Sequence, residues 1–286
     1  MRKLILTVVM VLAAAALFAD PVLNREDSWY NVSLSYENGF IKVLSHKLQF
    51  GDPGTLFDYV TQGGQEILFP FERFTADLEI FRRHRVTLLY QPLTIETQTK
   101  LEAPITIDGT LFDPAAPGAR YESLDLKYGF PFWRVSYLYF PIKRDNAWLG
   151  LGLSLQLRNA SIVFAASDGT ALTVSQNLGP VPILKLRGGY LFSGGLFLET
   201  EVDGFYASSK FFNGADFEFE GSILDANLRA GFALRDYLDI FANLRFLGGT
   251  ATGTSQYDKD YWTDGVEKYS NNRLATLTFT LGATLR

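Results

Sequence analysis

Charged residues recur at every second position within several apolar segments of this chain. In a strand, this spacing places the charges on one face and the apolar side chains on the other. Mixed-sign charges on one enclosed face can neutralise each other, or they can form a polar relay or a narrow solute path, and the sequence leaves both readings open. We predict an interior charge network of Arg73, Asp77, Glu79, Asp125, Lys127, Arg158, Lys185, Arg187, Glu199, Glu201, Asp203, Asp225, Arg229, Asp239 and Arg245.

The segment around Gly194 gives the most specific prediction about this network. If Phe192 pairs with Leu196 in a hairpin, Arg187 lies opposite Glu201 and Lys185 lies opposite Asp203. Opposite charges that face each other across two strands stabilise the pairing by about 0.2–1 kcal/mol per pair. The charges therefore also fix the register of the hairpin.

The chain has two histidines and no cysteine, so thiol chemistry and disulfides are excluded. His46 follows Ser45, but neighbouring side chains of a strand point to opposite faces and cannot form a nucleophile–base pair. His84 lies among Arg82, Arg83 and Arg85, where we expect a solvated turn. We predict no catalytic residue.

Two expected loops, residues 211–220 and 257–267, combine acidic side chains with aromatic ones. Calcium prefers such oxygen ligands, but the spacing does not match a known calcium loop. A solvated loop is the simpler reading, and we predict no cofactor and no metal ligand. Calcium binding remains a hypothesis for these acidic residues: Asp216, Glu218, Glu220, Asp258, Asp260 and Asp264.

Leucines occupy every second position from Leu149 to Leu157, with small or polar residues between them. Similar alternation indicates further strands at residues 29–36, 72–81, 85–97, 121–140, 183–192, 196–206, 222–234, 238–246 and 277–285.

Short turns near Arg83, Lys143, Gly194 and Asp236 alternate with long loops at residues 51–65, 100–120, 168–182, 208–221 and 248–272. Short turns at one end and long loops at the other are typical of outer-membrane barrels. We predict an all-β fold, a single closed antiparallel transmembrane β-barrel of about ten strands. Residues 40–50 and the break at Pro131 leave eight or twelve strands as alternatives. Since open aqueous channels need about 16–18 strands, we expect a largely filled lumen.

Residues 1–19 resemble a cleaved signal peptide, with Arg2 and Lys3 ahead of an apolar segment. The barrel domain is then residues 20–286. The net charge of −5 argues against nucleic acid as a partner.

Residues 83–92 (RHRVTLLYQP), 155–162 (LQLRNASI), 177–182 (NLGPVP) and 213–226 (NGADFEFEGSILDA) resemble small bacterial outer-membrane β-barrel proteins without an assigned activity. The resemblance implies export to the bacterial outer membrane, contact with membrane lipid and lipopolysaccharide, and insertion by the barrel-assembly machinery. We expect an envelope-structural role or a narrow passage for small solutes. The alternatives are a surface-loop binding protein, such as an adhesin, and a lipid-modifying enzyme with its site at the barrel rim.

Overall fold

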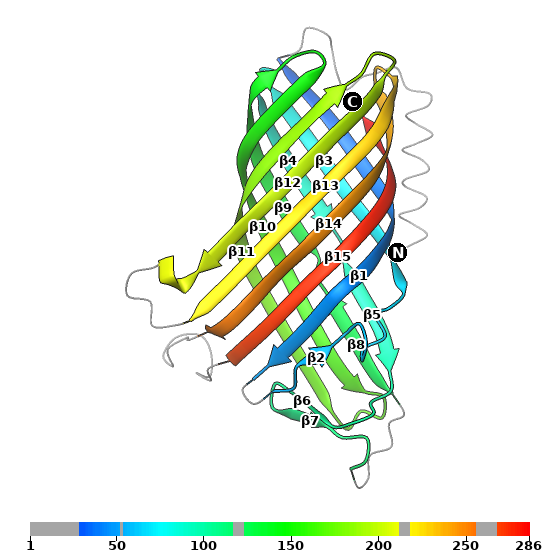
Figure 1. Cartoon of the computed structure of the whole chain (residues 1–286), viewed down its shortest axis with the longest axis vertical. Helices are drawn as coiled ribbons and strands as arrows, with labels where there is room; N and C mark the ends of the chain where they lie inside the picture. Colours follow the sequence, from blue (N-terminus) through cyan, green and yellow to red (C-terminus); the bar gives the residue numbers. More distant parts are fainter. Residues whose placement is uncertain (1–28, 52–53, 117–122, 212–217, 256–267) are drawn as a thin grey trace.

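The computed structural model describes residues 29–51, 54–116, 123–211, 218–255 and 268–286. Ten long strands form one closed barrel (Figure 1). In chain order they are β1 (Tyr30–Phe50), β3 (Leu68–Ile80), β4 (His84–Gln91), β9 (Phe132–Lys143), β10 (Ala147–Ala166), β11 (Leu172–Leu191), β12 (Leu196–Ser208), β13 (Phe219–Arg235), β14 (Leu238–Ser255) and β15 (Lys268–Leu285).

The barrel closes because β1 pairs with both β3 and β15. All pairings are antiparallel, so the prediction of a ten-stranded antiparallel barrel is confirmed. The four predicted tight turns connect β3 to β4, β9 to β10, β11 to β12 and β13 to β14 at one end, which we call the turn end. Gly194 and Gly195 have positive φ in one of these turns, a conformation that glycine adopts without steric cost. The opposite end of the barrel is called the loop end.

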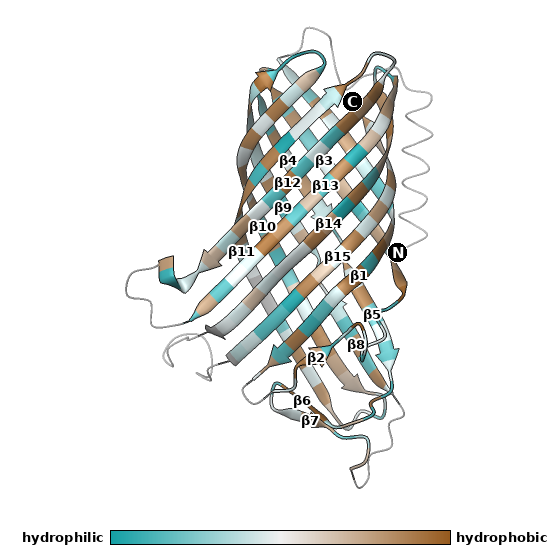
Figure 2. Cartoon of the chain, in the orientation of Figure 1, coloured by the Kyte–Doolittle hydropathy of each residue, from teal (hydrophilic) through white to brown (hydrophobic). Residues whose placement is uncertain are grey.

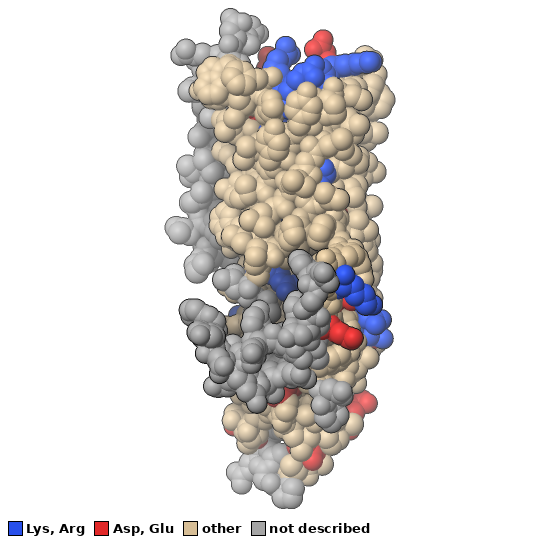
Figure 3. Space-filling model, turned by 90° about the vertical axis from the view of Figure 1, so that its left-hand side faces the viewer, with Lys and Arg blue, Asp and Glu red and all other residues tan. Residues whose placement is uncertain are grey.

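The outer face of the barrel is apolar near the turn end. The β10 leucines point outward, and Leu151, Leu153, Leu155 and Leu157 are each about half exposed. Brown and teal residues alternate along the strands (Figure 2), and a wide, almost uncharged band separates charges at the two ends (Figure 3). We call this part of the barrel the stem.

Several strands run further toward the loop end than the sequence alternation indicates. Residues 40–50 belong to β1, which continues to Phe50 beyond an irregularity between Val43 and Ser45. The predicted loop 168–182 is wrong from Leu172 onward, because β11 begins there and pairs with β10 through Pro180 and Pro182. The described parts of loop 248–272 belong to β14 and β15, whereas residues 256–267 lie outside the described residues.

Beyond the stem, an apolar core fills the barrel end, and we call this region the head. β5 (Thr94–Thr99) follows β4 after a break at Pro92, and β8 (Leu124–Gly129) precedes β9, from which a break at Pro131 separates it. The predicted loops 51–65 and 100–120 contribute β2 (Phe57–Asp58) and a hairpin of β6 (Ile105–Ile107) and β7 (Thr110–Phe112). The buried core of the head consists of Leu48, Phe57, Tyr59, Leu101, Ile105, Ile107, Phe112, Leu124, Leu126, Tyr128, Ile162, Phe164 and Ala166.

The one helical element among the described residues is a single 3₁₀ turn, η1 (Ser209–Phe211). No helix in the described part of the chain is long and apolar enough to cross a membrane.

Candidate functional site: a charged septum across the lumen

The predicted hairpin register is confirmed. Arg187 pairs with Glu201, and Lys185 pairs with Asp203, across β11 and β12. All four side chains point into the barrel and are almost completely buried. The alternation of charged and apolar residues on these strands therefore turns the charged face inward, as predicted.

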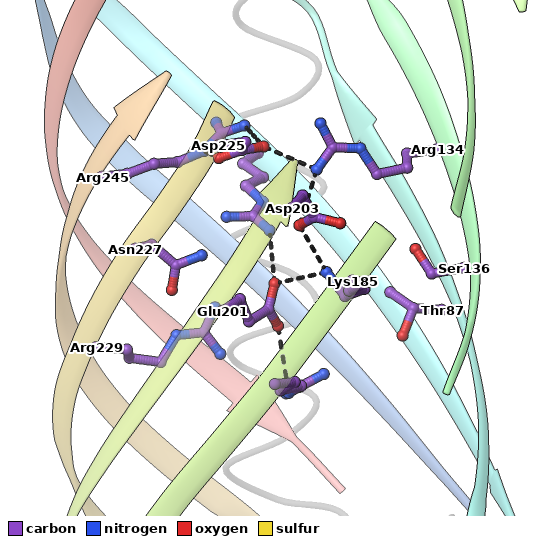
Figure 4. A network of polar contacts seen from close by, with 12 residues as sticks. Thr87, Arg134, Ser136, Lys185, Glu201, Asp203, Asp225, Asn227, Arg229 and Arg245 are labelled. Carbon is purple, nitrogen blue, oxygen red and sulfur yellow. Dashed lines mark hydrogen bonds and ion pairs between the residues drawn. The ribbon is translucent and has the colours of Figure 1, made fainter. Parts of the chain in front are cut away.

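An unbroken series of ion pairs crosses the lumen (Figure 4). Arg245 on β14 donates from Nε and Nη2 to the carboxylate of Asp225, both at 2.5 Å. Arg134 on β9 reaches across the barrel and lies 2.7 Å from Asp225 and 3.1 Å from Asp203. Lys185 then donates to Asp203 at 2.9 Å and to Glu201 at 3.0 Å. The series therefore links β9, β11, β12, β13 and β14.

A second arm closes the other side of the lumen through Glu37 on β1. Arg229 donates to Glu37 at 2.9 Å, and Asn243 and Thr280 donate to it at 2.7 and 2.9 Å. Arg73 on β3 lies 3.8 Å from Glu37 and 3.5 Å from Glu201, so it joins this arm to the first.

Eight of these residues form what we call the septum, and none is more than 4% exposed. Its four cations equal its four carboxylates in number. A buried ion without a partner is costly, whereas a balanced and hydrogen-bonded set offsets much of the cost of desolvation. The septum consists of Glu37, Arg73, Arg134, Lys185, Glu201, Asp203, Asp225 and Arg245.

Two cavities lie on opposite sides of the septum. The turn-end cavity, of about 270 Å³, is lined by polar groups that include Asp77, Glu199 and Arg229. The loop-end cavity, of about 220 Å³, is lined mainly by apolar side chains and by Gln156. No septum residue lines either of these cavities. The septum therefore separates two spaces that would otherwise form one continuous lumen.

Other predicted residues lie at the margins of the septum. Asp77 and Glu199 bind Arg187 at 2.9 and 3.1 Å on the turn-end side. Glu79 binds Arg85 and Lys143 at the turn-end mouth, at 2.7 and 2.8 Å. The other three residues also face inward. Arg229 bridges Glu37 and Glu199, Asp239 pairs with Arg286, and Arg158 lines the loop-end cavity.

Asp125 and Lys127 do not belong to the interior network, so this part of the prediction is wrong. Both lie on β8 with exposed side chains, while Leu124, Leu126 and Tyr128 of that strand are buried. Asp125 accepts a hydrogen bond from Gln98, and Lys127 lies 3.0 Å from Glu96. Because β8 belongs to the head, its apolar face points inward and its charged face points outward.

Sequence reasoning missed two central members of the septum, Glu37 and Arg134. Both could have been found from the alternation alone. Glu37 shares its face with Ser33 and Ser35, opposite the exposed apolar face of β1. Arg134 alternates with Trp133, Val135 and Tyr137, which are exposed. Uncharged polar partners such as Gln156 and Asn243 are a weaker indication of an inward-facing position than charged residues are.

Neither histidine faces the lumen charges. His46 lies in the head, in the part of β1 beyond the stem, where its Nδ1 donates to Gln65 Oε1 at 2.8 Å. Its ring stacks on Tyr59 and contacts the edge of Tyr128, with centroids 4.2 and 4.3 Å apart. Burial lowers the pKa of His46 to about 4. His84 begins β4 and its Nδ1 lies 2.7 Å from the hydroxyl of Tyr137.

The acidic loops are only partly described. Asp216, Asp258, Asp260 and Asp264 lie outside the described residues. Glu220 lies 3.3 Å from Lys210, and Glu218 precedes β13. Among the residues that the structure describes, no group of three or more potential ligands is arranged for a metal ion.

No family model matches the chain, and no curated protein matches it. Among solved structures, the outer membrane protease OmpT from Escherichia coli is similar over 91% of this chain and 99% of that one, with 10% identity and a TM-score of 0.47. A Pseudomonas aeruginosa FadL homologue covers 95% and 93%, with 10% identity and a TM-score of 0.36. Neisserial surface protein A covers 90% and 99%, with 12% identity and a TM-score of 0.34. At these identities the likeness concerns the barrel fold and assigns no role to any residue.

Proposed function

We propose that this chain is an integral protein of the bacterial outer membrane whose closed stem anchors the head outside the membrane and does not act as an aqueous pore. The role is envelope-structural in this sense. Its partners in the proposal are membrane lipid, lipopolysaccharide and, during insertion, the barrel-assembly machinery.

The dimensions and surface of the stem support the membrane location. Tyr30 to Phe40 on β1 and Leu196 to Tyr206 on β12 each span eleven residues, close to the 9–11 residues of a tilted membrane strand. Exposed aromatic side chains lie near both limits of the apolar band, as in the girdles of outer-membrane barrels. They include Trp29, Tyr30, Phe81 and Phe192 toward the turn end, and Phe40, Trp133 and Tyr206 toward the head.

The septum is the observation that carries the proposal of a closed stem. Among the described residues, neither the turn-end cavity nor the loop-end cavity extends through the level of Arg134 and Lys185. Moving a solute through this level would separate several buried ion pairs at once. Breaking even one such pair costs about 3–5 kcal/mol.

Conductance across planar lipid bilayers tests the proposal. We expect no channel steps from the wild-type protein. Arg73→Ser, Lys185→Ser, Glu201→Ser and Asp203→Ser combined remove two cations and two carboxylates, so the septum is thinned while its charge stays balanced. This variant should conduct ions.

A matched control changes the turn-end cavity instead. Glu79→Ser with Lys143→Ser likewise keeps the charge balanced, by removing one cation and one carboxylate, but it leaves the septum complete and should remain silent. Folding of each variant is checked by the shift in gel mobility between unheated and heated samples. Reproducible steps from the wild-type protein, similar to those of the septum variant, would overturn the proposal and favour a narrow passage for small solutes.

A further inference from the structure

The loop-end cavity is lined mainly by apolar side chains, with Gln156, Arg158 and Asn272 among its polar lining groups. Phe205, Ile223, Leu247 and Leu274 contribute to its lining, from four successive strands. Gln156 also lines it and accepts hydrogen bonds from Arg134 at 2.6 and 3.0 Å. Since Arg134 belongs to the septum, the septum supports this side of the cavity, and a molecule in the cavity has no route to the turn end.

The barrel wall beside this cavity is open between two strands. β11 and β12 pair from Leu191↔Phe197 only as far as Leu184↔Gly204. Beyond that point β11 continues toward Leu172 along β10, and β12 continues to Ser208 along β13. We call this gap the seam. Val181, Phe205 and Ala207 from its two edges line the cavity.

Two prolines account for the seam. Pro180 and Pro182 pair with Leu157 and Leu155 of β10, and this pairing is continuous through both prolines. A proline has no N–H to donate, and alternate residues of a strand direct their backbone groups to the same neighbour. Because the β10 pairing survives, the missing donors are those that would face β12. The sequence therefore removes two of the donors with which β11 could pair with β12 at the level of the cavity.

The seam begins at the outer limit of the apolar band. Gly204, the last paired residue of β12, precedes Tyr206 by two positions, and Tyr206 is 50% exposed. Phe211 and Phe219 are also exposed near the outer end of this edge, and Tyr206 contacts Phe211 with ring centroids 5.9 Å apart. In the proposed membrane location these aromatic residues lie at the lipid–headgroup boundary, so the seam opens at the headgroup surface of the outer leaflet.

We infer that the loop-end cavity binds a small uncharged hydrocarbon group, which enters from the outer leaflet through the seam. A dry cavity of about 150 Å³ can hold benzene, so one of about 220 Å³ has room for a substituted benzene or the end of an acyl chain. The apolar lining favours transfer of such a group from water, at about 25 cal/mol per Å² buried. The inference rests on the proposed membrane location.

Photolabelling of the protein in phosphatidylcholine nanodiscs tests the inference. The free probe is trifluoromethyl-phenyldiazirine, a small apolar carbene precursor, with toluene as competitor. We expect label on the inward-facing Phe205 and Leu247 that toluene removes, whereas label on the lipid-facing Leu153 persists. A second arm uses a phospholipid with the diazirine at the end of its acyl chain. Label from the free probe identifies a free solute as the source, and label from the lipid probe identifies an acyl chain.

Two variants locate the site and its entrance. Ala207→Phe fills the cavity and should abolish the competable label, whereas Ala165→Phe adds the same bulk on the outer face of β10 and should not. Leu184→Cys with Tyr206→Cys places the only two thiols of the chain at the membrane end of the seam and leaves both prolines in place. Bridging them with a short thiol crosslinker should abolish the label, and the unbridged protein should retain it.

The inference is overturned if neither probe labels the cavity, if Ala207→Phe labels like the wild type, or if bridging the seam changes nothing. Conductance of the same samples is measured in parallel. A conducting wild-type protein with a labelled cavity contradicts the closed stem alone, whereas a silent protein without cavity label contradicts the binding site alone.

Discussion

The stem and the head share one wall but have opposite interiors. Along β10 the inward-facing side chains change from Ser154 and Gln156 in the stem to Ile162 and Phe164 in the head, without a break in the alternation. The outward-facing side chains change in the reverse direction, from the leucines 149–157 to Asn159 and Ser161.

The same change occurs at one level on neighbouring strands. The inward face passes from Asp203 to Phe205 on β12, from Asp225 to Ile223 on β13, and from Arg245 to Leu247 on β14. The backbone pairing is continuous through this level. The medium outside the wall therefore decides which side chains can be inside: lipid favours an apolar exterior and a polar interior, and water favours the opposite arrangement.

The largest expected effect comes from removing one charge from the septum. Arg134→Met leaves Asp203 and Asp225 with one cation fewer, and breaking a buried ion pair in this way costs about 3–5 kcal/mol. We expect this loss in the free energy of unfolding, measured by urea titration in lipid vesicles. Arg134→Met combined with Asp203→Asn restores the balance of charge and should recover at least half of the loss. A double variant no more stable than the single one would show that charge balance is not what stabilises the stem.

A smaller effect is expected from placing a charge on the outward face of β10, and it should differ between the stem and the head. Leu153→Arg places a charge near the middle of the apolar band, where arginine costs about 2–4 kcal/mol in a membrane barrel. Ala165→Arg makes the same addition on the outward face of β10 in the head, at the position that pairs with Asp125. There we expect a change below about 0.5 kcal/mol, as for ordinary surface substitutions. Equal losses for the two variants would contradict the placement of the membrane around the stem only.

The stem could be predicted from the sequence because lipid and lumen impose a strict alternation on it. The ten strands, the four tight turns and the pairing of Arg187 with Glu201 all follow from that alternation and from turn residues. The predicted lumen network lacks Glu37 and Arg134, although both lie at positions that the alternation of their strands directs inward.

The head could not be predicted in the same way. Alternation on β8 separates Leu126 from Lys127 correctly, but it does not say which of the two faces points inward. That depends on where the membrane ends, and along β8 itself no residue pattern marks this level. Prolines were a second difficulty, because Pro180 and Pro182 indicate a loop, although a strand tolerates them along an unpaired edge.

Acidification should loosen the head before the stem. Burial lowers the pKa of His46 from 6.5 to about 4, so the folded head binds a proton less readily than the unfolded chain. Its stability is complete above the unfolded pKa and falls as the pH decreases toward the folded value, by about 2 kcal/mol at pH 5. Hydrogen exchange should therefore accelerate at pH 5 around Tyr59 and Gln65, with little change in the stem.

His46→Gln provides the control for this pH dependence. Glutamine does not titrate, and its amide can still donate to Gln65, so the acceleration between pH 7.5 and 5 should disappear. If the variant keeps the full pH dependence, another group in the head is responsible.

The smallest expected effect is that of Lys127→Met, whose exposed lysine–glutamate pair has a buried counterpart of equal length in the septum. Lys127 lies 3.0 Å from Glu96 in the head and Lys185 lies 3.0 Å from Glu201 in the septum, but the first pair is about half exposed and the second is buried. Exposed pairs contribute about 0–1 kcal/mol because water screens them, whereas removing one member of a buried pair costs about 3–5 kcal/mol. Lys127→Met should therefore change the unfolding free energy by less than about 1 kcal/mol, and Lys185→Met by several times more. A similar loss from both variants would mean that distance, and not the medium on each side of the wall, determines what these charges contribute.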